Sequence, residues 1–291
     1  MNPNKNIAKA FIEAFSDFIK KNNINIYRAT AITDDSISET VTFQDCNPCQ
    51  NSYSVSKVFT LTAIGVLYDE GLLQIDEKLT DIFGELCTAN MPEEWNDRTV
   101  EMAISHRCGL PCGYLDIDCQ NPSDFGKDYL SYILSTPLNE PEFSYTDAEF
   151  YLLSRIVSVR TKKTMLEYLW DKLFFPLEFR EVAWSSCPMN YPIGATGLYI
   201  QTEDMEKLGA VYLNKGIYNG QRIVSEKWVD LVLQKGFLYP YTTHGYGHAG
   251  MMGQMLAVFP NHNLTVAWHG FHQNEEEIRC WIESFLNNGL C

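Results

Sequence analysis

The chain has 291 residues, of which 45% are hydrophobic and 20% are charged, and its net charge is −15. A chain of this length buries a sizeable core without disulfides or metals, and the composition excludes a disordered tail protein. The negative charge excludes nucleic acid and anionic membrane surfaces as expected partners, because both require a cationic footprint on the protein. We therefore expect an ordinary soluble globular protein.

Charge is distributed unevenly along the chain. Residues 69–150 contain 18 acidic and 4 basic residues, whereas the remainder contains 19 and 18. We interpret the acidic segment as a solvated helical surface. Residues 236–274 contain no Asp, Glu, Lys or Arg, but Gly, Pro, Asn and His recur among them, which argues against a membrane span. This neutral segment indicates a buried sheet and the wall of a cleft.

The chain begins without the apolar core and cleavage site of a signal peptide, and it contains nine cysteines. An odd number of cysteines without an export signal favours reduced thiols, so we expect a cytoplasmic protein.

Candidate metal ligands are incomplete in this sequence. Cys46 and Cys49 have the spacing of half a zinc site, but no second pair matches them. The pairs His244/His248 and His269/His272 likewise lack a third ligand at a useful spacing. We therefore expect neither a metal nor a cofactor.

The predicted elements follow from hydrophobic periodicity and turn residues. A helix is predicted over residues 5–20 and a hairpin over 24–32 and 38–43, with Asp34-Asp35 at its turn. An 11-residue apolar run over 58–68 predicts a buried helix with Gly71 beyond its end. Polar helices and loops extend to about residue 190. Helices over 203–214 and 225–234 follow, the latter with Ser225 as its N-cap, then strands over 255–259 and 264–268 and a last helix over 275–286.

This order predicts an α/β (α+β) fold as a single unit, residues 1–291. Strands from both chain ends pair into one antiparallel sheet flanked by terminal helices, in a lobe made of residues 1–50 and 195–291. A mostly helical lobe, residues 51–194, is inserted between them. A cleft between two such lobes is where a site would form.

The sharpest chemical signal is Ser54-Val55-Ser56-Lys57 at the start of the predicted buried helix. Residues three apart share a helix face, and a serine hydroxyl becomes a nucleophile only when a neighbouring group takes its proton. Burial shifts a lysine toward its neutral form, and a helix N-terminus supplies N–H groups for an oxyanion. Taken alone, the Ser-x-x-Lys pattern occurs often by chance, and a serine near a helix start is usually a helix cap.

Further motifs follow in a fixed order. They are His106-Arg107-Cys108-Gly109, Ser144-Tyr145-Thr146-Asp147, Gly194-Ala195-Thr196-Gly197, and His248-Ala249-Gly250 with Gly253-Gln254. This ordered set, over residues 50–260, resembles the serine β-lactamase and penicillin-binding-protein superfamily, and most of all its class C and esterase-like branch.

The resemblance implies a β-lactamase/transpeptidase-like fold and a role for each matching residue. Ser54 matches the acylated nucleophile and Lys57 its proton-handling partner, while Tyr145 matches the general base that later acts as acid. Asp147, His248 and Gly250 match substrate-binding positions. The backbone N–H groups of Ser54 and Met251 match the oxyanion hole. A phenol with a reference pKa of about 10 needs a neighbouring cation to act as base, and Lys57 would supply it.

Two residues depart from the superfamily pattern. Asp147 replaces the usual Asn, and a carboxylate accepts hydrogen bonds only, although it could pair with Lys57 and hold it charged. His248 replaces the usual Lys, and a neutral imidazole binds a substrate carboxylate poorly, although a protonated one could still bind it. The interval from Tyr145 to His248 is also short. These departures weaken the case for β-lactam hydrolysis and leave acyl transfer from a neutral ester or amide open.

Three hypotheses therefore remain. The first is a serine hydrolase that acts on a small-molecule ester or amide (a β-lactam, a D-amino-acid peptide or a carboxyl ester). The second is a binding or sensing module that is acylated once and does not turn over. The third is a degenerate scaffold without chemistry. The oligomeric state is not predicted.

Overall fold

The chain folds into two compact units. The computed structural model describes residues 7–33, 38–86 and 91–288. Unit 1 comprises Met1–Val55, Phe174–Ala183 and Leu198–Cys291, and unit 2 comprises Ser56–Leu173 and Trp184–Gly197. The segment Phe174–Ala183 thus belongs to unit 1 although both of its neighbours along the chain belong to unit 2.

Unit 1 is built on a six-stranded antiparallel sheet with the order β2-β1-β11-β10-β9-β8. Its strands are β1 (Ile26–Ile32), β2 (Ser38–Thr42), β8 (Tyr239–Thr242), β9 (Gly245–Ala249), β10 (Met255–Phe259) and β11 (Leu264–Gly270). The central pairing joins the two ends of the chain, since Arg28 in β1 lies opposite His269 in β11. The predicted antiparallel sheet with strands from both ends is confirmed.

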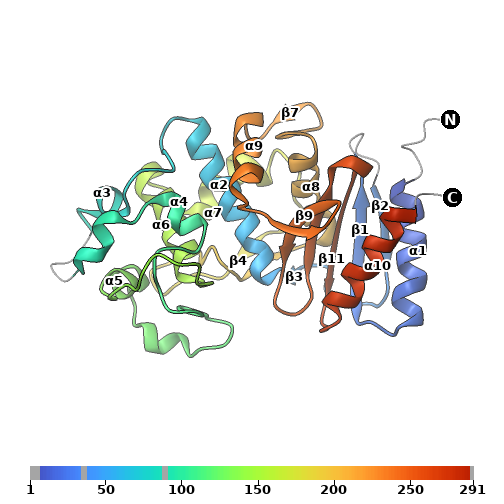
Figure 1. Cartoon of the computed structure of the whole chain (residues 1–291), viewed down its shortest axis with the longest axis horizontal. Helices are drawn as coiled ribbons and strands as arrows, with labels where there is room; N and C mark the ends of the chain where they lie inside the picture. Colours follow the sequence, from blue (N-terminus) through green and yellow to red (C-terminus); the bar gives the residue numbers. More distant parts are fainter. Residues whose placement is uncertain (1–6, 34–37, 87–90, 289–291) are drawn as a thin grey trace. The chain divides into compact units, whose positions relative to one another are not determined.

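Two terminal helices cover one face of this sheet, α1 (Ile7–Lys21) and α10 (Glu275–Asn288) (Figure 1). Their apolar side chains share a core cluster with alternate residues of β10 and β11, such as Ala257, Val266 and Trp268. Phe11 and Phe15 stack on each other in α1, and both contact Trp281 of α10. Aromatic pairs of this kind add stabilisation beyond their buried area.

The opposite face of the sheet is covered by α8 (Thr202–Leu213). Gly209 makes this close approach possible, because a Cβ there would lie 2.2 Å from the Thr265 hydroxyl oxygen. Thr265 and His269 point to this face, since residues alternate along β11 and Val266 and Trp268 belong to the core beneath α1 and α10. Thr202 opens α8 on the same side as His269.

The smaller elements of unit 1 lie between these strands in the chain. They are β3 (Gln50–Asn51), η2 (Tyr53–Val55), β5 (Leu198–Ile200), β6 (Ile217–Tyr218), β7 (Gln221–Arg222), α9 (Glu226–Lys235) and η6 (Pro260–His262). The strand β4 (Ala183–Trp184) and the π-helical turn η5 (Trp170–Phe174) lie where the chain passes between the units. In unit 1, β3 pairs with β5, and this pairing holds the segment just before Ser54.

Unit 2 is mostly helical. Its elements are α2 (Ser56–Asp69), α3 (Leu79–Phe83), η3 (Glu93–Asp97), α4 (Val100–Ile104), η4 (Pro122–Phe125), α5 (Tyr129–Leu134), α6 (Ala148–Thr161) and α7 (Met165–Leu169). The first twelve residues of α2 are all buried, as its continuous apolar sequence predicts. It packs against α6, which is buried over its first ten residues.

Most predicted elements lie within two residues of their observed bounds. Ser225 is the N-cap of α9 and accepts a hydrogen bond from the backbone N–H of Trp228, as predicted. The predicted turn at Asp34-Asp35 lies outside the described residues. Within the described ranges, no helix is long and apolar enough to cross a bilayer.

Candidate active site

Ser54 lies in a tight turn rather than in the buried helix itself. The sequence places it at the start of that helix, but the structure puts it in the 3₁₀ turn η2, and α2 begins at Ser56. The preceding residue, Tyr53, has a φ of 45°, in the left-handed region that non-glycine residues rarely adopt. Strained backbone of this kind clusters at functional sites, where the surrounding structure holds it.

Three contacts within unit 1 hold the turn in place. The backbone N–H of Ser52 donates to the carbonyl of Leu198, and its hydroxyl is 3.2 Å from Nε2 of His269. Nδ1 of His269 in turn lies 2.8 Å from the Thr202 hydroxyl. The backbone of Gly250 approaches so closely that a Cβ there would lie 2.8 Å from the carbonyl oxygen of Ser52.

His269 is therefore a buried bridge between the nucleophile turn and the start of α8. Burial lowers the pKa of its imidazole to about 3, so the ring is neutral near pH 7. A neutral imidazole has one donor and one acceptor nitrogen, which two flanking hydroxyls can both satisfy. In the sequence, His269 is recognisable only as one member of an incomplete metal-ligand pair.

The predicted residues around His248 follow one another from β9 into the turn that connects it to β10. His248 lies at the sheet position opposite Leu256, and its Nδ1 is 2.9 Å from the carbonyl oxygen of Ala249. Because a carbonyl only accepts, Nδ1 carries the proton and Nε2 is the acceptor in the neutral ring. Gly250 bonds to Gln254 across the turn, and the partly exposed Met251 follows it.

Lys57 is a buried cation with a carboxylate partner. Its side chain is 1% exposed and extends from α2 within unit 2. Nζ donates to Oδ1 of Asp147 at 2.7 Å and to the carbonyl oxygen of Ala195 at 3.1 Å. The Gly194-Ala195-Thr196-Gly197 motif thus supplies a backbone ligand for the lysine, and Gly194 also accepts a hydrogen bond from Thr60 in α2.

Tyr145 lies beside the same ammonium. Nζ of Lys57 is 4.7 Å from the centre of the Tyr145 ring. Burial alone would lower the pKa of Lys57, but the charge on Asp147 and the neighbouring Tyr145, together with hydrogen bonds to both, raise this pKa above its ordinary value. Lys57 is therefore charged near pH 7 and has no free basicity for proton abstraction. An ammonium beside a phenol stabilises the phenolate form.

The surroundings of Asp147 are acidic. One carboxylate oxygen from each of Asp116, Asp118 and Asp147 lies within 4.8 Å of the others. Burial, together with the charges of Asp147 and Asp116, raises the pKa of Asp118, against the effect of a hydrogen bond from Thr196. The ammonium of Lys57 is the cation bonded to this cluster through Asp147.

A second buried pair supports the segment that carries Tyr145. His106 and Glu149 are at most 1% exposed, and Nδ1 of His106 lies 3.0 Å from the Glu149 carboxylate. Glu149 also accepts hydrogen bonds from the Thr146 hydroxyl and the backbone N–H of Cys108. The imidazole of His106 packs against Tyr145, with ring centres 4.5 Å apart. The motif around His106 is visible in the sequence, but the support that His106 gives to Tyr145 is not.

The predicted residues fall into two groups, one in each unit. Unit 2 brings Lys57, Tyr145 and Asp147 into contact. Unit 1 carries Ser54 and the β9 turn, and in that unit η2 packs against β9. One carboxylate oxygen of Asp147 accepts a hydrogen bond from Lys57, which is the pairing that its acceptor-only chemistry allowed. The substrate contact of Asp147 stays a prediction.

The motifs that contain the predicted site residues lie within a match to a known protein family. The Beta-lactamase family profile matches residues 50–282, which include every predicted site residue. The predicted resemblance is therefore confirmed.

Individual relatives are distant. A 6-aminohexanoate-dimer hydrolase of Paenarthrobacter ureafaciens is 24% identical over 240 residues, which are 74% of this chain and only 56% of that protein. The chain thus spans about half the length of this curated relative.

Solved structures establish the fold. A family VIII carboxylesterase superposes with a TM-score of 0.71 at 17% identity and covers 95% of each chain. A penicillin-binding protein homologue from Caulobacter crescentus gives a TM-score of 0.69 at 17% identity and 91% coverage of each. The predicted β-lactamase/transpeptidase-like fold is confirmed.

Proposed function

Since this chain belongs to the Beta-lactamase family, we propose that it is a serine hydrolase that cleaves a small ester or amide through an acyl-enzyme on Ser54. The observation that carries this proposal is the environment of Lys57. A buried ammonium that donates to Asp147 lies 4.7 Å from the centre of the Tyr145 ring, which places a cation beside the phenol that the proposed reaction uses as its base. Hydrolase names among its relatives agree with this reading.

In the proposed acylation step, the Tyr145 phenolate takes the proton of the Ser54 hydroxyl as its oxygen attacks the substrate carbonyl. The bond to the leaving group then breaks, and the leaving group receives the proton from Tyr145. Lys57 remains an ammonium throughout and stabilises the phenolate at the start and end of the step. The tetrahedral oxyanion is bound by the backbone N–H groups of Ser54 and Met251, each worth about 3–4 kcal/mol in a site without water.

Deacylation reverses these roles. Tyr145 takes a proton from water, the hydroxide adds to the acyl carbonyl, and Ser54 leaves with the proton that Tyr145 returns. The carboxylic acid product then departs. Because each step uses the same base, loss of Tyr145 would slow both halves of the reaction.

The charges near Lys57 favour a neutral acyl substrate. Asp116, Asp118 and Asp147 form an acidic surrounding that repels a substrate carboxylate. Whenever the His248 imidazole is neutral with its proton on Nδ1, Nε2 is an acceptor and offers no hydrogen to a carboxylate. A carboxyl ester or a neutral amide therefore fits this chain better than a penicillin does.

A labelling and turnover experiment tests the proposal. A fluorophosphonate probe is expected to label the protein once, and p-nitrophenyl acetate is expected to release many equivalents of p-nitrophenol. Ser54→Ala should abolish both, whereas the matched control Ser56→Ala, which removes the neighbouring buried serine, should retain labelling. Labelling that persists in Ser54→Ala would contradict the assignment of the nucleophile.

The second candidate is a module that is acylated once and then holds the acyl group. The structural similarity to a penicillin-binding protein homologue is the reason to retain this second candidate function. It predicts one equivalent of p-nitrophenol in a burst with no steady release, and labelling at Ser54 as before. No labelling by any acylating reagent would instead indicate a scaffold without chemistry.

A further inference from the structure

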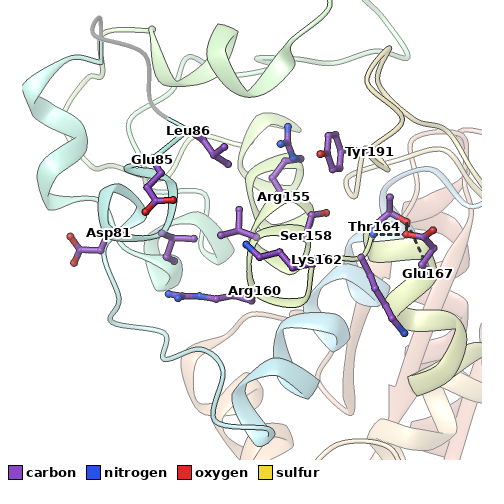
Figure 2. A pocket seen from close by; sticks show the side chains of 13 residues that line it. Asp81, Glu85, Leu86, Arg155, Ser158, Arg160, Lys162, Thr164, Glu167 and Tyr191 are labelled. Carbon is purple, nitrogen blue, oxygen red and sulfur yellow. Dashed lines mark hydrogen bonds between the residues drawn. The ribbon is translucent and has the colours of Figure 1, made fainter.

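Unit 2 contains a cavity that the proposed reaction does not use. It has a volume of about 610 Å³ and is lined by α3, the C-terminal half of α6, the start of α7 and Tyr191 (Figure 2). This volume lies in the range of small-molecule sites. Its charged lining residues are Asp81, Glu85, Arg155, Arg160, Lys162, Lys163 and Glu167.

Arg155 stands out among these residues because it is buried without an anion. Its side chain belongs to a residue that is 5% exposed, and its guanidinium carbon lies 3.6 Å from the centre of the Tyr191 ring. One N–H donates to the Tyr151 hydroxyl at 3.2 Å. Within the described ranges, Nε has no hydrogen-bond partner and no carboxylate lies within ion-pair distance of the guanidinium.

Two of the other three cations of the lining are already paired. Arg160 forms an ion pair with Glu77, and Lys163 lies 2.9 Å from a carboxylate oxygen of Asp171. Glu167 closes a capping box with Thr164 at the start of α7. These residues are therefore accounted for within the fold, whereas Arg155 is not.

An unpaired buried guanidinium indicates a missing anionic partner. Buried charges in proteins are normally paired, because removing an ion from water is costly. Tyr191 covers one face of the guanidinium, so an anion must approach in the plane of the N–H groups. That plane suits the two oxygens of a carboxylate, which form two parallel hydrogen bonds with an arginine fork.

We propose that this cavity binds a small organic carboxylate, with its two oxygens on Arg155 and its apolar part against Ile82 and Leu86. The exposed side chain of Lys162 adds a second positive charge to the lining. The exposed carboxylates of Asp81 and Glu85 line the same cavity and disfavour a doubly charged anion such as phosphate. The bound form therefore carries one negative charge.

Ligand-detected NMR titration of the whole chain with hexanoate tests this site. We expect saturable binding of hexanoate, with at least about tenfold weaker binding of neutral hexanamide and of inorganic phosphate, since a charge-assisted bidentate contact is lost or opposed. Arg155→Gln should weaken hexanoate binding about tenfold or more. Lys162→Gln, an exposed change that spares the fold, should weaken it about threefold, and Lys235→Gln in α9 should not change it.

The outcomes separate this site from the proposed active site. Ser54→Ala should bind hexanoate with unchanged affinity, because the cavity does not depend on acylation. Loss of binding in Ser54→Ala, unchanged binding in folded Arg155→Gln together with Lys162→Gln, or no saturable binding of hexanoate would each overturn the proposal. Phosphate binding tighter than hexanoate would overturn the assignment of ligand class.

Discussion

Two of the buried cations of unit 2, Lys57 and Arg155, differ in how their charge is balanced. Lys57 donates to the carboxylate of Asp147, whereas Arg155 stacks on Tyr191 and has no carboxylate partner among the described residues. The first charge is balanced within the fold, so it can serve a neighbouring phenol without an added ligand. The charge of Arg155 is not balanced by a carboxylate of the described part of the fold, so it is available to bind an anionic ligand. A buried cation can therefore indicate function in two ways, through the residues that it contacts and through the absence of an anionic partner.

The largest expected effect is on catalysis at the balanced cation. Lys57→Ala should lower kcat/KM for p-nitrophenyl acetate by about 10⁴-fold, because residues that act as one catalytic unit fail together. Arg155→Ala should leave kcat/KM within about twofold. Stopped-flow acylation rates, normalised to folded protein by circular dichroism, measure both. A Lys57→Ala protein that acylates at the normal rate would remove the lysine from the mechanism.

Stability should show the same contrast. Lys57→Met leaves the Asp147 carboxylate buried without its cation and should lower the free energy of unfolding by about 3–5 kcal/mol. Arg155→Met removes a charge that has no carboxylate partner, so the change should be under about 1 kcal/mol in either direction. Urea titration without added carboxylates gives both values. Equal losses would mean that Arg155 is already balanced in the fold.

Removing the balancing charge should change substrate preference. Asp147→Asn supplies the amide donor that the superfamily pattern contains, and it also lowers the pKa of Lys57 by deleting the carboxylate. We expect the rate on a penicillin-like amide, relative to p-nitrophenyl acetate, to rise about tenfold. Glu142→Gln, an exposed change on the same loop, is the control. An unchanged ratio would refute the role given to this departure.

The last contrast concerns the pH dependence of stability at His269, whose folded pKa is about 3 against an ordinary value of 6.5. Between these pH values the unfolded chain binds a proton that the folded protein does not. Stability should therefore fall as the pH drops from 6.5 to 3, by about 1.4 kcal/mol per pH unit from this residue. His269→Gln should flatten the slope by that amount in urea titrations across this range. An unaltered slope would show that His269 is not buried as a neutral ring.

The sequence predicted features that depend on local pattern. The buried helix α2 and the β10–β11 hairpin follow from apolar runs and turn residues only a few positions long. The match of Ser54, Lys57 and Tyr145 to a family came from ordered motifs, and the contact between Lys57 and Tyr145 agrees with it. The pairing of Asp147 with Lys57 was also predictable. The superfamily has Asn at this position, and a carboxylate cannot donate as that amide does, but it can accept from a lysine.

Features that depend on distant pairs were not predictable. His269 bridges Ser52 and Thr202, which lie 217 and 67 positions away from it along the chain. The partner of His106, Glu149, is 43 positions away, and neither residue has a local pattern that identifies the other. The left-handed φ of Tyr53 likewise has no sequence signal, since glycine or asparagine would be expected there.

The pairing of β1 with β11 has a consequence for synthesis of the chain. When the ribosome has released β1 and β2, the strand edge that will receive β11 remains open until residue 270 emerges. An open, apolar edge is a template for pairing with other nascent chains. Expression at high rate should therefore produce aggregates that slower translation or a chaperone prevents. A circular permutant that begins at β10 would close this edge early.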